Sequence, residues 1–174
     1  FGTGKVSILR EIIGHYGKKV LIIKGKKYPE PEILFSICKD ANLEWNCFNV
    51  ENEPNIKLVN RAVEFGREKE SDFVIGFGGG SVIDTGKAVA AILNNQGSLL
   101  DYLEVVGKGE PLINPSKPYI AIPTTAGTGS EVTKNAVISV PNKRVKVSMR
   151  NEYLLPKVAI VDPELTYELP KTIT

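Results

Sequence analysis

The sequence predicts an α/β fold in which helices cover both faces of a parallel sheet. Short apolar runs alternate with amphipathic stretches of helical length, which is the pattern of repeated βαβ units. Two of these runs, ending at Phe77 and Ile122, lead directly into loops rich in glycine or threonine. The chain has 174 residues, of which 42% are hydrophobic, so it is long enough for one such domain with a sizeable core.

The first half of the chain alternates helices and strands. Residues 6–16 predict a helix, with apolar residues at positions 6, 8, 9, 12 and 13 and Gly17 as its stop. Residues 20–23 are a continuous apolar run, typical of a strand covered on both faces. An amphipathic helix over 32–41 and a strand over 44–50 follow, and Asn55 caps a helix from Ile56 to about Lys69.

The second half continues the alternation and then changes pattern. A strand over 73–77 precedes a helix over 82–93, whose start carries Ser81 and Asp84 at the spacing of a capping box. A short helix is predicted over 99–105, and the Gly- and Pro-rich residues 107–118 predict a surface loop. The remaining predicted elements are a strand over 119–122, a hairpin of 136–140 and 144–148 on the rim of the sheet, and a last strand over 158–161.

Composition excludes several classes of function. The net charge of +2 is too small to argue for nucleic acid, and no apolar run approaches the roughly 18 residues that span a bilayer. Two scattered cysteines and the absence of a signal peptide favour the cytoplasm. His15 is the one histidine, which excludes a three-histidine zinc site and a Ser-His-Asp triad. The sequence therefore predicts no metal ligands and no catalytic residues within this chain.

Three glycines, Gly78-Gly79-Gly80, follow the strand that ends at Phe77, and Ser81 opens the next helix. Glycine lets backbone N–H groups approach a ligand closely, and a helix N-terminus adds unpaired N–H groups and the positive end of a dipole. This combination is typical of a phosphate site. The third glycine of the Rossmann fingerprint and both ends of a P-loop are missing, which disfavours an ATPase, and a tight strand-to-helix turn is the alternative.

Two charged residues lie farther along the same helix, and each has two interpretations. Asp84 is either the acidic half of the capping box or a partner for a polar edge of the ligand. Lys87 is either a solvated helix residue or part of the same site.

A second loop follows the strand over 119–122 and carries four hydroxyl groups and two glycines in one short stretch. Hydroxyls and backbone N–H groups bind phosphate or amide groups without charge. Two such loops after two parallel strands predict a nucleotide cofactor lying across one edge of a Rossmann-like sheet, with a hydroxyl-rich connector as the alternative for the second loop. The hydroxyls belong to Thr124, Thr125, Thr128 and Ser130.

The two loops closely resemble the signature motifs of the iron-containing (group III) alcohol dehydrogenase family. The matching stretches are Gly78-Gly79-Gly80-Ser81-x-x-Asp84-x-x-Lys87 and the run from Pro123 to Thr133. Phe1-Gly2-x-Gly4 resembles the family's opening turn, and Val158–Thr166 resembles the close of its N-terminal domain. The resemblance implies an NAD(P)-binding α/β domain followed by an all-helical domain, in an enzyme that transfers hydride between the nicotinamide and a small alcohol or aldehyde.

The resemblance also implies roles for individual residues. Gly78, Gly79, Gly80 and Ser81 would form the pyrophosphate loop, and Asp84 would approach the nicotinamide. Thr124, Thr125 and Thr128 would line the cofactor groove, and Lys146 would contact the ribose.

The chain departs from the family in two respects. The family holds iron or zinc with an aspartate and three histidines in its helical domain, and none of the four is present here. Residues 1–174 are therefore expected to be the dinucleotide-binding domain alone, inactive by itself, with the metal only in the full-length enzyme. Gly25 occupies the position of the acidic residue of NAD-preferring members, amid Lys24, Lys26 and Lys27, which predicts NADP as the preferred cofactor, with NAD possible.

Two alternative functions stay open, and the sequence also predicts the assembly state. The first alternative is a relative such as glycerol dehydrogenase or the lyase dehydroquinate synthase, although the threonine-rich loop argues against the lyase. The second is a non-catalytic dinucleotide-binding module. An apolar surface at 165–173, which would lead into the helical domain, predicts a homo-oligomer.

Overall fold

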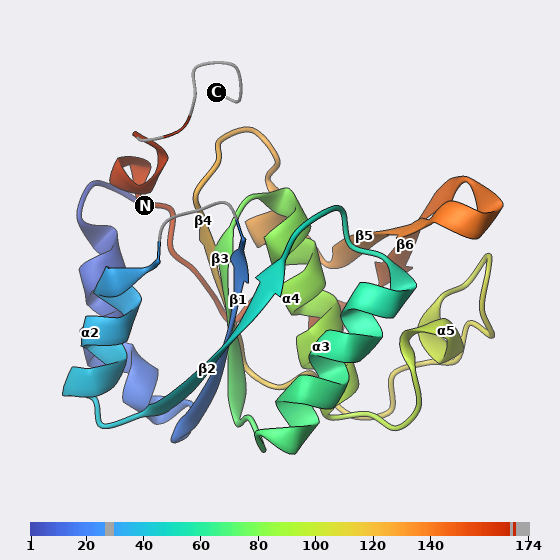
Figure 1. The fold of residues 1–174 in the computed structure, drawn as a ribbon, viewed down its shortest axis with the longest axis horizontal. Helices are drawn as coiled ribbons and strands as arrows, with labels where there is room; N and C mark the ends of the chain where they lie inside the picture. The colour runs from blue at the N-terminus through green and yellow to red at the C-terminus, as the bar shows by residue number, and fades with distance from the viewer. Residues whose placement is uncertain (27–29, 168, 170–174) are drawn as a thin grey trace.

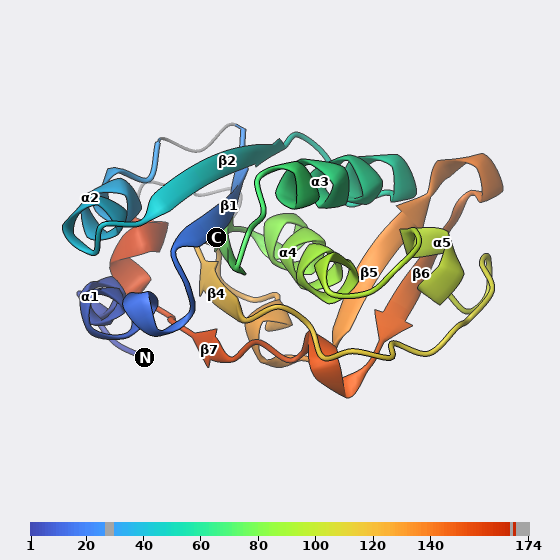
Figure 2. The same cartoon turned by 90° about the horizontal axis from the view of Figure 1, so that it is seen from below.

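A computed structural model describes residues 1–26, 30–167 and 169. Its centre is a five-stranded sheet with the order β2-β1-β3-β4-β7, in which every neighbouring pair is parallel (Figures 1 and 2). The predicted α/β fold with a parallel sheet is therefore confirmed. The strands are β1 (Lys19–Gly25), β2 (Glu44–Val50), β3 (Phe73–Gly78), β4 (Tyr119–Pro123) and β7 (Val158–Ala159).

Helices cover both faces of the sheet because both faces of its central strands are apolar. On one face α1 (Leu9–Ile12) and α2 (Glu32–Asp40) pack on Ile22 and Ile75. On the other face α3 (Ile56–Glu68) and α4 (Gly80–Leu93) pack on Leu21 and Val74 (Figure 2). The short α5 (Leu99–Tyr102) lies beside α3 (Figure 1), and the 3-10 helices are Lys5–Ile8, Ile13–His15, Ser130–Val132, Pro141–Lys143, Glu152–Leu154 and Pro163–Thr166.

The predicted hairpin forms from β5 (Asn135–Val140) and β6 (Val145–Arg150). It packs on the far side of α4 rather than extending the sheet, so α4 lies between the sheet and the hairpin (Figure 2). This position explains why α4 is apolar around most of its circumference, with ten of its residues buried. The hairpin is also tied to the end of the β2–α3 loop, because the Ser139 N–H donates to the Pro54 carbonyl at 2.7 Å.

A buried tyrosine links the sheet to α4. Tyr119, the first residue of β4, is 3% exposed, and its hydroxyl donates to the Ile83 carbonyl at 3.0 Å. Two glycines make room for this side chain. A Cβ atom on Gly76 would lie 2.1 Å from the Tyr119 hydroxyl oxygen, and one on Gly86 would lie 2.5 Å from it.

The two ends of the described chain are held together by one carboxylate. Asp162 is 1% exposed, and its Oδ1 and Oδ2 atoms accept hydrogen bonds from the N–H groups of Gly4 and Val6, at 3.2 and 3.0 Å. The Gly2 N–H donates to the Val161 carbonyl at 3.1 Å. The opening turn therefore lies against the segment that follows β7.

Two predicted helices are shorter than expected. The helix over 6–16 is a single α-helical turn between two 3-10 turns, because Gly14 and the β-branched Ile12 and Ile13 disfavour a continuous α-helix. The helix over 99–105 ends at Tyr102, since Leu103 is extended. None of the helices in the described ranges combines the length and the apolar character needed to span a bilayer.

Candidate active site: the cofactor edge

The candidate site lies where the sheet changes its direction of growth. From β1 the chain crosses through α2 to the edge strand β2, and it returns through α3, on the opposite face, to β3. Helices on opposite faces diverge at such a switch point and leave a crevice at the carboxyl ends of the strands, which is where open α/β sheets bind ligands. Gly25 closes β1 and Gly78 closes β3, so the predicted glycines stand on either side of this crevice.

The glycine loop and the threonine loop lie directly against each other. A Cβ atom on Gly79 would lie 3.2 Å from the side chain of Thr125, and one on Gly80 would lie 3.1 Å from Thr128. Gly79 and Gly80 therefore let the two loops pack closely where they meet, beside the first turn of α4. The Thr124 N–H donates to the Gly78 carbonyl at 3.0 Å, which joins the two loops at their base.

The predicted capping box at Ser81 and Asp84 is wrong. α4 begins two residues earlier than a Ser81 cap requires: Gly79 is its N-cap residue, and no side chain among the described residues caps the helix. Within the described residues, the N–H groups of Gly80 and Ser81 consequently have neither an intrahelical acceptor nor a capping oxygen, which suits an anion. The capping box of this chain is formed instead at α5, by Ser98 and Asp101.

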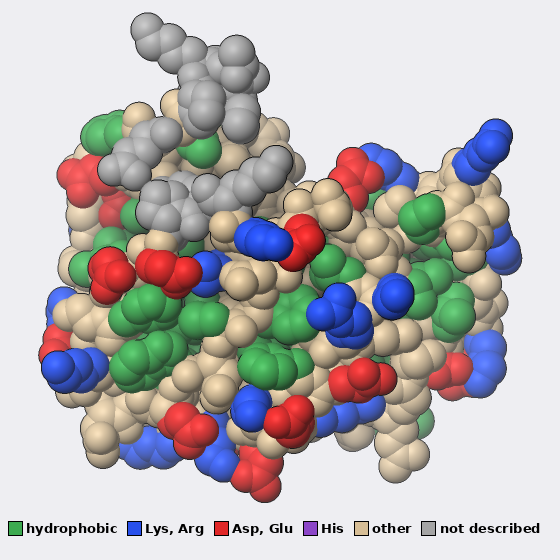
Figure 3. Space-filling model, in the orientation of Figure 1, with side chains coloured by type: hydrophobic (Ala, Val, Ile, Leu, Met, Phe, Trp, Pro, Cys, Tyr) green, Lys and Arg blue, Asp and Glu red, His purple; other side chains and the backbone are tan. Residues whose placement is uncertain are grey.

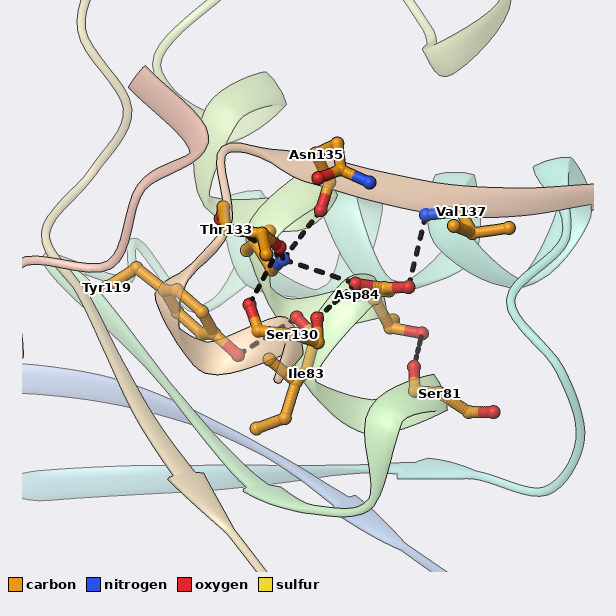
Figure 4. Close-up of polar contacts among 10 residues, drawn as sticks. Ser81, Ile83, Asp84, Tyr119, Ser130, Thr133, Asn135 and Val137 are labelled. Carbon is orange, nitrogen blue, oxygen red and sulfur yellow. Dashed lines mark hydrogen bonds and ion pairs between the residues drawn. The ribbon is translucent and has the colours of Figure 1, made fainter. Parts of the chain in front are cut away.

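The Asp84 carboxylate points away from the start of α4 and toward the hairpin (Figure 4). Its Oδ1 atom accepts a hydrogen bond from the Ser130 hydroxyl at 2.5 Å, and its Oδ2 atom accepts one from the Val137 N–H at 3.1 Å. Lys87 lies 3.2 Å from Oδ1 as an ion pair. Asp84 thus joins α4 to the second loop and to β5, which explains why it is unavailable as a cap.

Lys87 is a buried residue rather than a solvated one. Its side chain is 0% exposed, and its Nζ atom donates to the Asn135 carbonyl at 2.6 Å and to the carbonyl and hydroxyl of Thr133 at 3.3 and 3.1 Å. Burial lowers the pKa of Lys87, and the neighbouring Asp84 opposes that shift.

A cavity of about 160 Å³ opens beside the first turn of α4. It brings together three of the predicted site residues, Ser81, Asp84 and Lys146, of which Lys146 extends from β6. Glu53 lies on the same cavity, and its carboxylate pairs with the Lys146 ammonium at 2.6 Å. Glu53 was not predicted from the sequence, where its one signal is its place just after the end of a strand. The remaining lining residues are Pro54, Val137 and Ser139.

The threonines differ in what they present to this edge. Thr124 is 1% exposed, so its hydroxyl lies below the surface and only its backbone contributes to the loop. Thr125 is half-buried and Thr128 is exposed, and both lie beside Gly79 and Gly80. Thr125 and Thr128 are therefore the threonines of this loop whose side chains reach the surface beside the glycine loop.

Gly25 lies one strand away from the glycine loop, paired with Val50 at the end of β2. The positive charge expected around it is largely neutralised. Lys24 is 3% exposed and its ammonium pairs with Glu30 at 2.8 Å, and Lys26 pairs with Glu51 at 2.7 Å. Lys27 falls outside the described residues.

A metal site is not apparent in the part of the chain that the structure describes. No group of three or more His, Cys, Asp or Glu side chains there is arranged to hold a metal ion. The residues of this edge suit an anion and polar groups, and they do not fit iron or zinc.

Comparison with known proteins shows the family. The family model for iron-containing alcohol dehydrogenase matches residues 1–163. The chain is 34% identical to a mitochondrial hydroxyacid-oxoacid transhydrogenase of Caenorhabditis elegans, across 99% of the chain and 39% of the relative. It is 33% identical to the NADH-dependent butanol dehydrogenase A of Clostridium acetobutylicum, across 100% of the chain and 45% of the relative.

Solved structures indicate the same family. The sulfoacetaldehyde reductase of Bifidobacterium kashiwanohense in complex with NAD+ superposes with a TM-score of 0.88 at 31% identity, across 99% of this chain and 46% of that one. A 1,3-propanediol oxidoreductase superposes with a TM-score of 0.90 at 30% identity, across 100% and 46% of the two chains. The chain thus spans less than half the length of these relatives, and it corresponds to their N-terminal portion. Its sequence, its sheet and its two loops together place it in the iron-containing alcohol dehydrogenase family.

Proposed function

We propose that residues 1–174 are the dinucleotide-binding domain of a metal-dependent, NAD(P)-linked alcohol dehydrogenase. The observation that carries this proposal is the uncapped N-terminus of α4, where Gly79 and Gly80 pack closely against Thr125 and Thr128. A pyrophosphate placed there accepts hydrogen bonds from the first-turn N–H groups and interacts favourably with the helix dipole. The related reductase that was solved with NAD+ supports the choice of ligand.

Other residues of the edge orient the two halves of the cofactor. The bound nicotinamide supplies the chemistry, which is the acceptance or donation of a hydride. Lys146, on the exposed rim of the cavity beside Ser81 and Asp84, is placed to donate to a ribose hydroxyl once it leaves Glu53. An exposed ion pair such as Lys146–Glu53 contributes at most about 1 kcal/mol, so exchanging it for a ribose contact costs little. We place the metal and the alcohol or aldehyde on another part of the enzyme.

Titration of the purified protein with NAD, NADP, ADP-ribose and ATP tests the proposal. We expect both dinucleotides and ADP-ribose to bind in competition, because they share the pyrophosphate, and ATP to bind more weakly. Failure of both dinucleotides to bind would refute it. Turnover of small alcohols by the complete enzyme separates a dehydrogenase from a non-catalytic dinucleotide-binding module, which would bind the cofactor without producing NAD(P)H.

We also propose that the protein prefers NADP to NAD, because of Gly25. In dinucleotide folds an acidic residue at the end of the strand beside the glycine loop binds the adenosine ribose, and its charge repels a 2′-phosphate. Gly25 ends β1, the neighbour of β3, and provides no such carboxylate. Since Lys24 and Lys26 already have carboxylate partners, the preference rests mainly on the missing carboxylate. We expect NADP to bind roughly tenfold more tightly than NAD, which is equivalent to about 1.4 kcal/mol.

Calorimetric titration of the wild type and of Gly25→Asp with both cofactors measures this preference. Gly25 is part of a regular strand, so aspartate fits its backbone, and we expect the substitution to favour NAD. Equal affinities in the wild type, or tighter binding of NAD, would show that another position sets cofactor choice.

Self-association and a cytoplasmic location stay predictions. An apolar cluster over the edge strand β2 supports the first (Figure 3), since Trp45 there is 37% exposed and stacks on Phe35 with 5.9 Å between ring centroids. The predicted apolar surface at 165–173 lies largely outside the described residues. Acidic and basic side chains are otherwise interspersed on this face (Figure 3).

A further inference from the structure

The Lys87 ammonium has no donor left for a ligand. An ammonium carries three N–H donors, and Lys87 directs them at the Asn135 carbonyl, at Thr133 and at the Asp84 carboxylate. Its side chain is fully buried between α4 and the segment that leads into β5. Lys87 therefore contributes to the site through its protein partners.

Those partners belong to the two segments that complete the cofactor edge. Asp84 accepts hydrogen bonds from Ser130, at the end of the threonine loop, and from the N–H of Val137, in β5. The Lys87 contacts to Thr133 and Asn135 lie between these two points. The pair thus holds residues 130–137 against α4 by bonds from both charges (Figure 4).

The same segment sets the position of three residues that we propose contact the cofactor. The threonine loop that ends at Ser130 places Thr125 and Thr128 against the glycine loop. In the hairpin, Ser139 of β5 lies opposite Lys146 of β6, so any shift of β5 along α4 moves Lys146 relative to the cavity.

A gain in fold stability does not by itself explain the buried Asp84–Lys87 ion pair. A buried ion pair loses much of its attraction to the desolvation of both charges, and an apolar pair of similar volume often stabilises a fold as well or better. Its directed hydrogen bonds do fix one geometry among several that apolar packing would permit.

We infer that Lys87 is a positioning residue: through Asp84 and Ser130 it fixes the threonine loop and the β5–β6 hairpin in the geometry that admits the dinucleotide, without touching the dinucleotide itself. This inference rests on the proposed function for its cofactor part. Its structural part, the immobilisation of residues 124–137, holds independently of any ligand.

Ser130→Ala tests the inference in a variant that should remain folded, because it removes one hydroxyl and leaves the Asp84–Lys87 pair intact. We expect amide hydrogen exchange across residues 124–137 to become at least fivefold faster and dinucleotide affinity to fall about fivefold, with the melting temperature lowered by only a few degrees. Ser148→Ala is the matched control. Ser148 lies in β6, is half-buried and makes no side-chain hydrogen bond within the described residues, so exchange and affinity should equal those of the wild type.

Lys87→Met extends the test to the lysine. Methionine matches the shape of the aliphatic stem, so the variant should fold, but it makes none of the hydrogen bonds of the ammonium. Amide exchange in 124–137 should therefore become faster than it is in Ser130→Ala, and it should increase more there than in regions away from the hairpin. Unchanged exchange and affinity in Ser130→Ala would overturn the inference, and so would a uniform acceleration over the whole Lys87→Met protein. If the wild type binds no dinucleotide but Ser130→Ala still loosens 124–137, the proposed function fails and the positioning role stands.

Discussion

Gly79→Val is expected to weaken dinucleotide binding at least a hundredfold with little loss of fold stability. The backbone of Gly79, with φ of −76° and ψ of −177°, is in a region that valine adopts, so the substitution does not strain the chain. The new Cβ atom would lie 3.2 Å from Thr125, and the valine methyl groups would occupy the space between the two loops. Two charge-assisted hydrogen bonds to phosphate, at about 1.5–3 kcal/mol each, would be lost, which corresponds to about a hundredfold or more.

Gly14→Val is the matched control, because nothing lies within 4 Å of the position that its Cβ atom would occupy and its φ is not positive. Calorimetry should give wild-type affinity for Gly14→Val and no measurable binding for Gly79→Val, while both keep the circular dichroism spectrum of the wild type. Wild-type affinity in Gly79→Val would show that the glycine loop does not contact the dinucleotide.

Gly76→Ala should be the most destabilising small substitution in the sheet, at about 3 kcal/mol. The added Cβ atom would lie 2.1 Å from the Tyr119 hydroxyl oxygen, in a core where Tyr119 is buried, and overpacking of this kind costs about 1–3 kcal/mol or more. The displaced hydroxyl would also lose its bond to the Ile83 carbonyl (Figure 4). For a domain of this size we expect the melting temperature to fall by about 10 °C.

Tyr119→Phe provides the internal control for this prediction. Alone it removes one hydrogen bond and costs about 1 kcal/mol. In combination with Gly76→Ala it should recover part of the stability lost to overpacking, because the nearest remaining ring atom would be 3.0 Å from the new Cβ atom instead of 2.1 Å. It should not rescue Gly86→Ala, where a ring carbon stays at 2.6 Å. Chemical denaturation of the single and double variants measures both couplings, and equal rescue of the two alanines would contradict this account.

Those features that depend on local sequence alone were predictable. The bounds of β2 agree with the predicted strand over 44–50, and Asn55 caps α3 through the Leu58 N–H as expected. The glycine loop was recognisable because a buried strand that runs into three glycines and a helix has few structural solutions. The position of the threonine loop followed from the parallel sheet, since parallel strands bring their carboxyl ends to one edge.

Contacts between distant segments were not predictable in the same way. Asp84 has the spacing of a capping residue, but its partners Ser130 and Val137 lie about fifty positions farther along the chain, and these long-range bonds outcompete the local one. Lys87 was ambiguous for the same reason, because the hairpin that buries it is formed by residues after 134. The lysines near Gly25 suggested a phosphate site because the sequence does not show which acidic residues lie beside them. In the structure, Lys24 and Lys26 pair with glutamates.

The junction at Asp162 has a mechanical consequence. Since the opening turn and the segment after β7 are bonded to each other, a pulling force applied at the two ends of the described chain is borne first by the bonds of Asp162 and by the Gly2–Val161 bond. These few hydrogen bonds would break one after another before the force acted on β4 or on the glycine loop. We therefore expect a force applied at these two ends to open the junction before it disturbs the strands that carry the cofactor edge.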